Sequence, residues 1–172
     1  MPRLFTTLWP TRTVLDELVV ALLAAERWPP PGWRAIPTDR WHLTLCFHGD
    51  ADPEPLARHL AARIAGLRPP LLRLGGAVGF PSVLAAGVEA ASATDTEALT
   101  ALVAAAGGDP GRFRAHVTVA RARRREATSP PPVQVLREYR GSWWLPDAVC
   151  LVRSEEVLGA RRYTVVHRES LA

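Results

Sequence analysis

Apolar positions along the chain predict an alternation of strands and helices. Eight short apolar runs have the length and residue types of strands, at residues 4–8, 33–36, 41–47, 71–78, 83–88, 113–120, 149–152 and 163–166. Helical spacing predicts three longer helices, which open at Thr11, at Asp52-Pro53 and at about Asp95, and a short one at 133–139. Gly79 to Ser82 connects two strands as a hairpin. Because hairpins are mixed with crossovers, the pattern predicts the α+β class.

Two of the predicted strands contain the same tetrapeptide, His-apolar-Thr-apolar. The copies are His42-Leu43-Thr44-Leu45 and His116-Val117-Thr118-Val119. Side chains alternate along a strand, so His and Thr share one face and the aliphatic pair takes the other. Chance gives two such copies only roughly a few times in a thousand at this composition. The pair therefore indicates two related lobes that meet at a central groove.

The same alternation assigns the neighbours of these tetrapeptides to faces. Cys46 is expected on the face of His42 and Thr44, and Arg121 on the face away from Thr118, unless a bulge or strand end turns it back. Phe47 and Phe80 are expected in the core, with base stacking by one of them as the alternative. The arginines after position 120 predict a solvated loop over 121–132, or a segment that steers an anionic substrate toward the groove.

Length and charge limit the kinds of protein that fit this pattern. A chain of 172 residues suits one domain, or two small lobes that share a core. The net charge is +4 and every basic residue is arginine, which favours anionic partners. Two cysteines form neither a disulfide framework nor a zinc pattern, so a reducing cytoplasm is expected. From the sequence we expect no signal peptide, no membrane span and no obligate protein partner.

Two imidazoles and two hydroxyls in one groove suit the cleavage of a phosphodiester. At neutral pH one histidine can act as a base while the other, protonated, acts as an acid. The base takes a proton from water, the acid protonates the departing ribose oxygen, and Thr44 and Thr118 donate hydrogen bonds to phosphate oxygens. No carboxylate cluster or zinc spacing occurs, so catalysis without metal or cofactor is expected.

The residues around both tetrapeptides resemble the sequence blocks of a known family. Arg40 to Gly49 is similar to a block ending in HLTL-x-F-x-G, and Phe113 to Arg121 is similar to its second block. Further matches are Phe5 with Leu8-Pro10, the Gly79-Phe80-Pro81 turn, Ala86-Gly87-Val88, and a late Ser154 before Gly159 and Tyr163. Together these stretches span nearly the whole chain. The chain thereby resembles the two-histidine (2H) phosphoesterase superfamily, in its LigT-like branch of RNA 2′,3′-cyclic phosphodiesterases.

The resemblance implies a fold, an activity and a role for each motif residue. The expected fold is bilobal and pseudo-twofold, one domain over residues 1–172, with two small antiparallel sheets backed by helices around a central active-site groove. The expected activity is hydrolysis of a terminal 2′,3′-cyclic phosphate on RNA or a nucleotide to a 2′-phosphate. His42 would be the general acid and His116 the general base, with Thr44 and Thr118 holding the phosphate. Arg121 and Phe47 are further candidates for substrate binding.

Two alternative functions remain open on the sequence. One is a module that binds RNA or nucleotides without catalysis. The other is a ligase that joins RNA ends through 2′,5′ linkages, which is essentially the reverse chemistry. An RNA end with a cyclic phosphate, tested with and without a 5′-hydroxyl partner strand, separates these possibilities.

Overall fold

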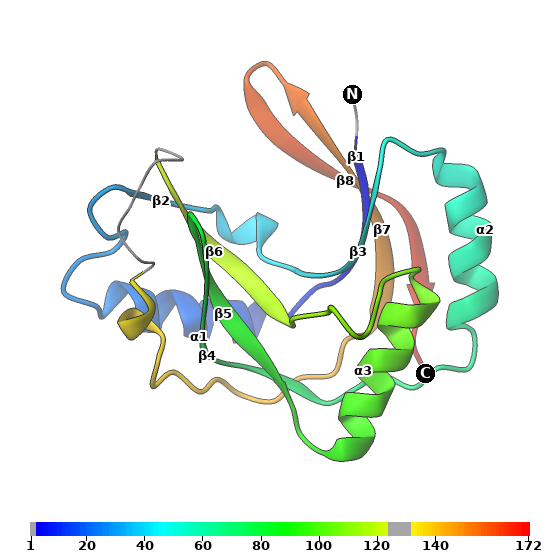
Figure 1. Ribbon diagram of the computed structural model, residues 1–172, viewed down its shortest axis with the longest axis horizontal. Coiled ribbons are helices and arrows are strands. Elements are labelled where there is room, and N and C mark those ends of the chain that lie inside the picture. The colour runs from blue at the N-terminus through cyan, green and yellow to red at the C-terminus, as the bar shows by residue number, and fades with distance from the viewer. Residues whose placement is uncertain (1–2, 124–131) are drawn as a thin grey trace.

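The computed structural model describes residues 3–123 and 132–172, and its elements largely match the predicted ones (Figure 1). The helices are α1 (Arg12–Leu23), α2 (Pro53–Ile64) and α3 (Ala93–Ala105), with short 3-10 turns η1 (Thr38–Arg40) and η2 (Val133–Val135). The strands are β1 (Arg3–Leu8), β2 (Trp33–Ala35), β3 (Leu43–Gly49), β4 (Leu72–Phe80), β5 (Val83–Ala90), β6 (His116–Ala122), β7 (Ala148–Val157) and β8 (Ala160–Ser170). Antiparallel strands combined with helices confirm the α+β class.

All strands belong to one antiparallel sheet that has two halves. The order is β4-β5-β6-β3-β1-β7-β8, and β2 pairs with β6 beside β3. Strands β3 and β6 form a single register pair, Leu43 with Val117. The two sheets expected from the sequence are therefore halves of one sheet joined at this pair. The halves diverge on either side of it, as Figure 1 shows.

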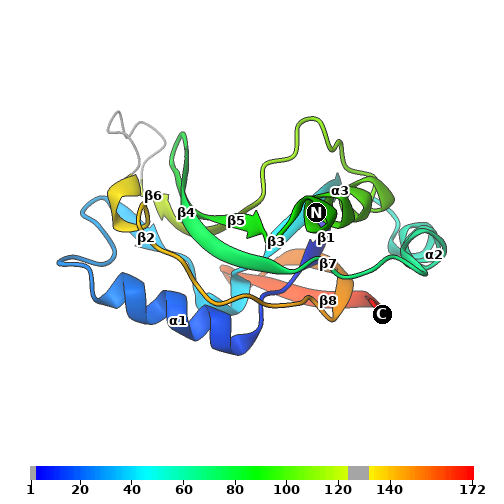
Figure 2. The same ribbon diagram turned by 90° about the horizontal axis from the view of Figure 1, so that it is seen from below.

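Helices cover one face of the sheet, which we call the core face. α1 packs against β4, α2 against β7 and β8, and α3 against β3 and β5. Their apolar sides share one hydrophobic cluster with Leu43 and Val117, both fully buried. Figure 2 shows α1 at one half of the sheet and α2 and α3 at the other. The opposite face carries no helix at the two histidines.

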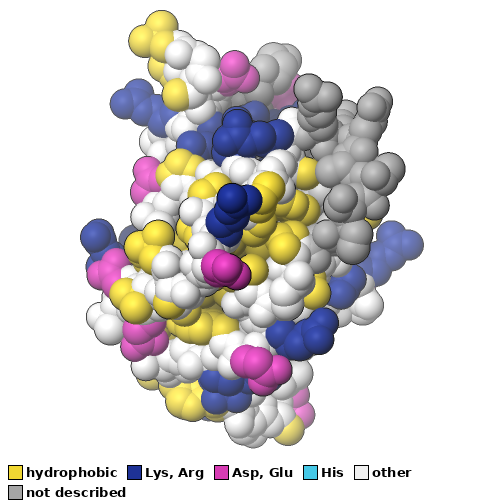
Figure 3. Space-filling view, turned by 90° about the vertical axis from the view of Figure 1, so that its left-hand side faces the viewer, with side chains coloured by type: hydrophobic (Ala, Val, Ile, Leu, Met, Phe, Trp, Pro, Cys, Tyr) yellow, Lys and Arg dark blue, Asp and Glu magenta, His cyan; other side chains and the backbone are white. Residues whose placement is uncertain are grey.

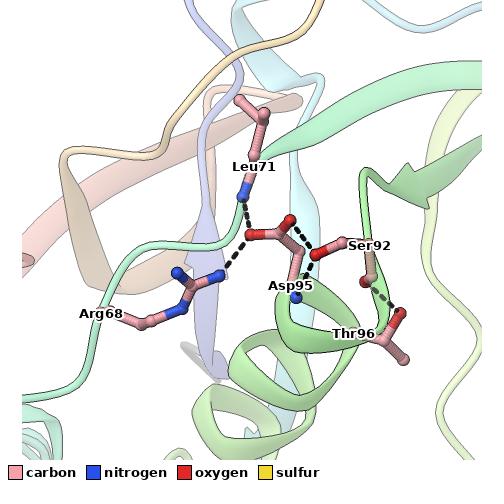
Figure 4. A network of polar contacts seen from close by, with 5 residues as sticks. All are labelled: Arg68, Leu71, Ser92, Asp95 and Thr96. Atoms are coloured by element: carbon pink, nitrogen blue, oxygen red, sulfur yellow. Dashed lines mark hydrogen bonds and ion pairs between the residues drawn. The ribbon is translucent and has the colours of Figure 1, made fainter.

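Side-chain caps fix the helix starts that the sequence predicts. Thr11 accepts a hydrogen bond from the Val14 amide, and Asp52 accepts one from the Glu54 amide. At α3 the helix begins at Ala93, because Ser92 caps it through the Asp95 amide. Figure 4 shows the Asp95 carboxylate, which accepts hydrogen bonds from the Leu71 amide, the Ser92 hydroxyl and the Arg68 guanidinium. These bonds, led by that of Leu71, lower the pKa of Asp95.

The structure corrects several predicted boundaries. Strand β3 begins at Leu43 and not at Trp41, because η1 continues to Arg40 and the Trp41 indole donates to the Ile36 carbonyl at 2.8 Å. Strand β6 begins at His116 and continues through Arg121, so the predicted loop begins later. The predicted helix at 133–139 is only the 3-10 turn η2. Residues 124–131 of the loop lie outside the described residues.

Candidate active site

The single contact between the two halves of the sheet brings the two His-Thr pairs together. Leu43 and Val117 pair antiparallel and point into the core. Register around that pair sets His42 opposite Thr118 and Thr44 opposite His116. All four side chains thus lie on the face without helices, which we call the motif face. Each of the four is half-buried.

A β-bulge follows each threonine and reverses the faces of the residues beyond it. In β6, Thr118 pairs with Ala85 and Ala120 with Leu84, so Val119 is the extra residue. In β3, Thr44 pairs with Thr7 and Cys46 with Thr6, so Leu45 is the extra residue. Both extra residues are buried. As a result the third residue after each threonine returns to the motif face.

These bulges change the positions expected for three candidate residues. Arg121 pairs with Arg34 and Val83 and lies on the motif face. The bulge in β6 is thus the exception to strict alternation under which the sequence placed Arg121 on this face. Phe47 occupies the equivalent place in β3, pairs with Phe5 and is 77% exposed, so its expected burial is wrong. The placement of Cys46 beside His42 is also wrong, because Cys46 lies on the core face, where burial raises the pKa of its thiol.

Both catalytic candidates are held by the same local hydrogen bond. Nδ1 of His42 lies 2.6 Å from the Arg40 carbonyl oxygen, and Nδ1 of His116 lies 2.6 Å from the Arg114 carbonyl oxygen. A carbonyl oxygen only accepts, so Nδ1 of each ring carries the proton. Nε2 is consequently the atom that each ring can use for chemistry, as a base when neutral and as an acid when protonated.

Aromatic rings surround His42 more completely than His116. The Phe5 ring stacks on His42 with 4.8 Å between centroids, and the rings of Trp9 and Tyr163 lie at 5.3 and 5.5 Å. Among the described residues, His116 contacts one aromatic ring, that of Phe80, at 4.8 Å between centroids. Phe80 is half-buried and carries the Arg114 guanidinium over its ring, so it also departs from the expected core position.

Burial and nearby positive charge lower the pKa of both histidines. Burial lowers the pKa of His42 to about 4, opposed by the Arg40 carbonyl and reinforced by the charges of His116 and Arg121. The pKa of His116 is lowered chiefly by burial, opposed by the Arg114 carbonyl and reinforced by Arg114 and Arg121. Because Arg121 acts on both rings, its charge lies at the site. A bound anion has the opposite effect and favours the imidazolium.

The two threonine hydroxyls complete a set of donors around the space between the rings. Neither the Thr44 nor the Thr118 hydroxyl makes a hydrogen bond to another of the described residues. By contrast, Thr6 and Thr7 in the neighbouring strand are buried and bonded, to the His48 ring and to the Leu43 carbonyl. Thr44 and Thr118 are thus able to donate to a ligand.

Other histidines and cavities lie apart from this set. His48 bonds to Thr6 and Cys46 on the core face. A hollow of about 230 Å³ between α1 and η1 contains none of the four motif side chains, and it is lined mainly by apolar residues including Leu22, Trp28 and Ile36. Figure 3 looks at the side that carries β2 and the end of α1, where hydrophobic side chains gather among arginines.

Two kinds of feature are absent from the described residues. Across residues 3–123 and 132–172, no three His, Cys, Asp or Glu side chains gather in a way that could hold a metal ion. Among the helices of the same residues, none has the length and apolar character needed to cross a membrane.

Comparisons with known proteins agree on one family. A family model described as the 2′-5′ RNA ligase superfamily matches residues 16–157. An RNA 2′,3′-cyclic phosphodiesterase of Thermus thermophilus is 34% identical over 91% of this chain and 85% of its own length. The crystal structure of TT0787 of Thermus thermophilus superposes with a TM-score of 0.70 and 29% identity, covering 98% of this chain and 97% of that one. E. coli LigT complexed with ATP has a similar fold, with a TM-score of 0.70, 23% identity and 99% of each chain covered.

Proposed function

Because the chain belongs to the 2′-5′ RNA ligase superfamily, we propose that it is an RNA 2′,3′-cyclic phosphodiesterase that converts a terminal cyclic phosphate to a 2′-phosphate. The relative from Thermus thermophilus with this name covers most of the chain, and the superfamily is one of phosphoesterases. The observation that carries the proposal is the matched pair of rings on one face, each with Nδ1 bonded to a carbonyl and with no hydrogen bond from Nε2 to another described residue.

The proposed reaction assigns one proton transfer to each histidine. Nε2 of His116 takes a proton from water, whose oxygen attacks the phosphorus. The bond between phosphorus and the 3′-oxygen breaks, and Nε2–H of His42 protonates that oxygen. The 2′-oxygen keeps the phosphate, so the product ends in a 2′-phosphate and a 3′-hydroxyl.

The remaining motif-face residues are assigned to binding. Thr44 and Thr118 donate hydrogen bonds to the non-bridging oxygens of the phosphate. Arg121, which lies close enough to lower the pKa of both rings, neutralises charge on the same oxygens. Phe47 offers an exposed ring beside Phe5, 6.0 Å between centroids, on which a base can stack. No step requires a metal or a cofactor.

The assignment of His42 as the acid sets a condition on the bound state. With a pKa near 4, His42 is neutral in the free protein at neutral pH. Substrate phosphate must therefore raise the pKa of His42 enough for it to hold a proton when the ribose oxygen leaves. The Phe5 ring, which stacks on His42, supports this, because an imidazolium gains attraction from an aromatic face that a neutral ring lacks.

Substitution of the histidines tests the proposal. His42→Ala and His116→Ala should each lower kcat for an RNA end with a 2′,3′-cyclic phosphate by about 10²–10⁴-fold, as expected for lost general acid or base catalysis. Thr44→Ala and Thr118→Ala should each cost about 10-fold, since one charge-assisted hydrogen bond is lost. His59→Ala on the exposed side of α2 and Thr100→Ala on α3 serve as matched controls. Near-full activity of either histidine variant rejects the mechanism.

Three broader expectations belong to the same proposal. Residues 1–172 act as one domain with two lobes, which the single register pair between the halves of the sheet supports. The protein works in the cytoplasm, where its two free cysteines stay reduced. Its partner is the RNA end itself.

The alternative function is ligation through a 2′,5′ linkage. Ligation requires a 5′-hydroxyl strand and yields a longer RNA in the same assay.

A further inference from the structure

Several arginines on the motif face have no carboxylate partner among the described residues. Eight arginines pair with carboxylates: Arg12, Arg58, Arg68, Arg73, Arg112, Arg140, Arg153 and Arg168. No carboxylate among the described residues lies within 4.0 Å of the charged groups of Arg3, Arg34, Arg121 or Arg161. All four lie on the motif face by register. Arg168 also lies on this face, opposite Cys150, but it pairs with Asp147. The motif face therefore carries four arginines that no carboxylate of the described residues neutralises, two on each side of the histidines.

Two of these arginines form an arm that leads away from His42. Across β1, β7 and β8 the register sets Arg3 beside Ser154 and Ser154 beside Tyr163. Arg161, two residues before Tyr163, donates from Nη1 to the Ser154 hydroxyl at 3.1 Å. Tyr163 contacts both Phe5, at 5.1 Å, and His42. These contacts and register pairs thus connect His42 through Tyr163 to Arg3 and Arg161 along one face of the sheet.

The arm ends where the β7–β8 hairpin projects beyond the rest of the sheet (Figure 1). Successive residues on one face of a strand are about 7 Å apart, so Arg161 lies one such step beyond the row of Arg3 and Tyr163. Glu156 is the register partner of Arg161 but forms no ion pair with it. The other two of these four arginines, Arg34 and Arg121, lie on the opposite side of the site, on β2 and β6.

The chemistry proposed above decides which arm meets the RNA. In an in-line displacement the attacking water and the departing 3′-oxygen lie on opposite sides of the phosphorus. His116 activates the water and His42 protonates the 3′-oxygen, so the ribose lies on the side of His42. The rest of the strand is attached to that ribose through its 5′-oxygen. It therefore leaves the site over β1, β7 and β8.

We propose that Arg3, Tyr163 and Arg161 form a binding track for the RNA strand on the 5′ side of the cyclic phosphate, so that the enzyme prefers RNA ends to mononucleotides. This inference rests on the proposed function and adds to it the path of the substrate. The arginines bind backbone phosphates, and the edge of Tyr163 adjoins the terminal nucleoside. Arg161 is already oriented by Ser154, so less freedom is lost when a phosphate binds.

The test compares two substrates of different length. These are 2′,3′-cyclic UMP and an eight-nucleotide RNA ending in a 2′,3′-cyclic phosphate. The wild-type protein should have a kcat/KM at least about 10-fold higher for the octamer. The double variant Arg3→Gln/Arg161→Gln should lose most of that preference. Its kcat/KM for the mononucleotide should stay within about twofold of the wild-type value. The salt dependence of the octamer reaction should also weaken, by about 1.4 units of logarithmic slope, because two phosphate contacts to a single strand are lost.

Two further variants separate the possible outcomes. Arg63→Gln, an exposed arginine of α2 without a carboxylate partner among the described residues, should change neither substrate. If Arg34→Gln lowers the octamer rate while Arg3→Gln and Arg161→Gln do not, the strand leaves over β2 and the inference is wrong. Equal wild-type rates on both substrates also overturn it.

Failure of the proposed function gives a different result. In that case the wild-type protein hydrolyses neither substrate. Binding of a fluorescent octamer ending in a 3′-phosphate, followed by anisotropy, then tests the track without catalysis. Binding that the paired arginine substitutions do not weaken overturns the inference by itself.

Discussion

At the scale of single residues, the most informative feature is that the same local hydrogen bond holds both histidine rings. Each ring donates from Nδ1 to the carbonyl two residues earlier, His42 to Arg40 and His116 to Arg114. A repeated His-x-Thr pattern predicted that the rings share a face, and the structure places both on it. The sequence contained no signal for their different surroundings, because Phe5, Trp9 and Tyr163 come from distant parts of the chain.

The lowered pKa values of both histidines predict where the pH profile lies. The reaction needs one neutral and one protonated ring, and kcat/KM reports the free enzyme. Since both pKa values lie below 6.5, the maximum of kcat/KM should fall below pH 6.5. The maximum of kcat should lie at higher pH, because bound phosphate favours the imidazolium. The acidic and alkaline limbs of the pH profile report apparent pKa values of the coupled pair of histidines and not of either residue alone.

Removal of Arg121 should shift this profile in a defined direction. Its positive charge lowers both pKa values, so Arg121→Gln should raise both and move the kcat/KM maximum to higher pH. Arg123→Gln, an exposed arginine just past the end of β6, is the matched control and should leave the position of the maximum unchanged. A maximum that stays in place or moves to lower pH in Arg121→Gln contradicts the electrostatic account.

Among the elements, the two β-bulges decide which residues accompany each His-Thr pair. Strict alternation placed Cys46 at the site and Arg121 away from it. The bulges at Leu45 and Val119 bring Phe47 and Arg121 to the motif face and turn Cys46 to the core. The extra residues are ordinary aliphatic ones, so the tetrapeptide alone does not reveal a bulge. Helix starts were predictable because Thr11 and Asp52 are local capping signals.

The β4–β5 hairpin supports His116 through a close backbone approach. Gly87 is the register partner of His116, and a Cβ added there would lie 2.5 Å from the Gly75 carbonyl oxygen. Gly87→Ala should therefore destabilise the fold by about 1–3 kcal/mol, the usual cost of overpacking, and lower kcat by moving His116. Gly111→Ala, in an exposed turn, is the control. Urea unfolding measures the first effect, and an unchanged midpoint for Gly87→Ala contradicts the packing argument.

For the whole molecule, one contact defines the site: two halves of a sheet meet at Leu43 and Val117 and leave the histidines beside that contact. The α+β class followed from the order of apolar runs, and the family from two short motifs with their flanks. The joining of the halves into one sheet did not follow, because a single register pair between residues 74 positions apart leaves no local signal.

Analysis of the reaction product in the presence of EDTA tests the central claim most directly. An RNA ending in a 2′,3′-cyclic phosphate is incubated with the protein, with and without EDTA and with and without a 5′-hydroxyl strand. The proposed mechanism predicts a 2′-phosphate end, formed at the same rate after chelation, and no longer RNA. A 3′-phosphate end, or a rate abolished by EDTA and restored by a divalent cation, contradicts it.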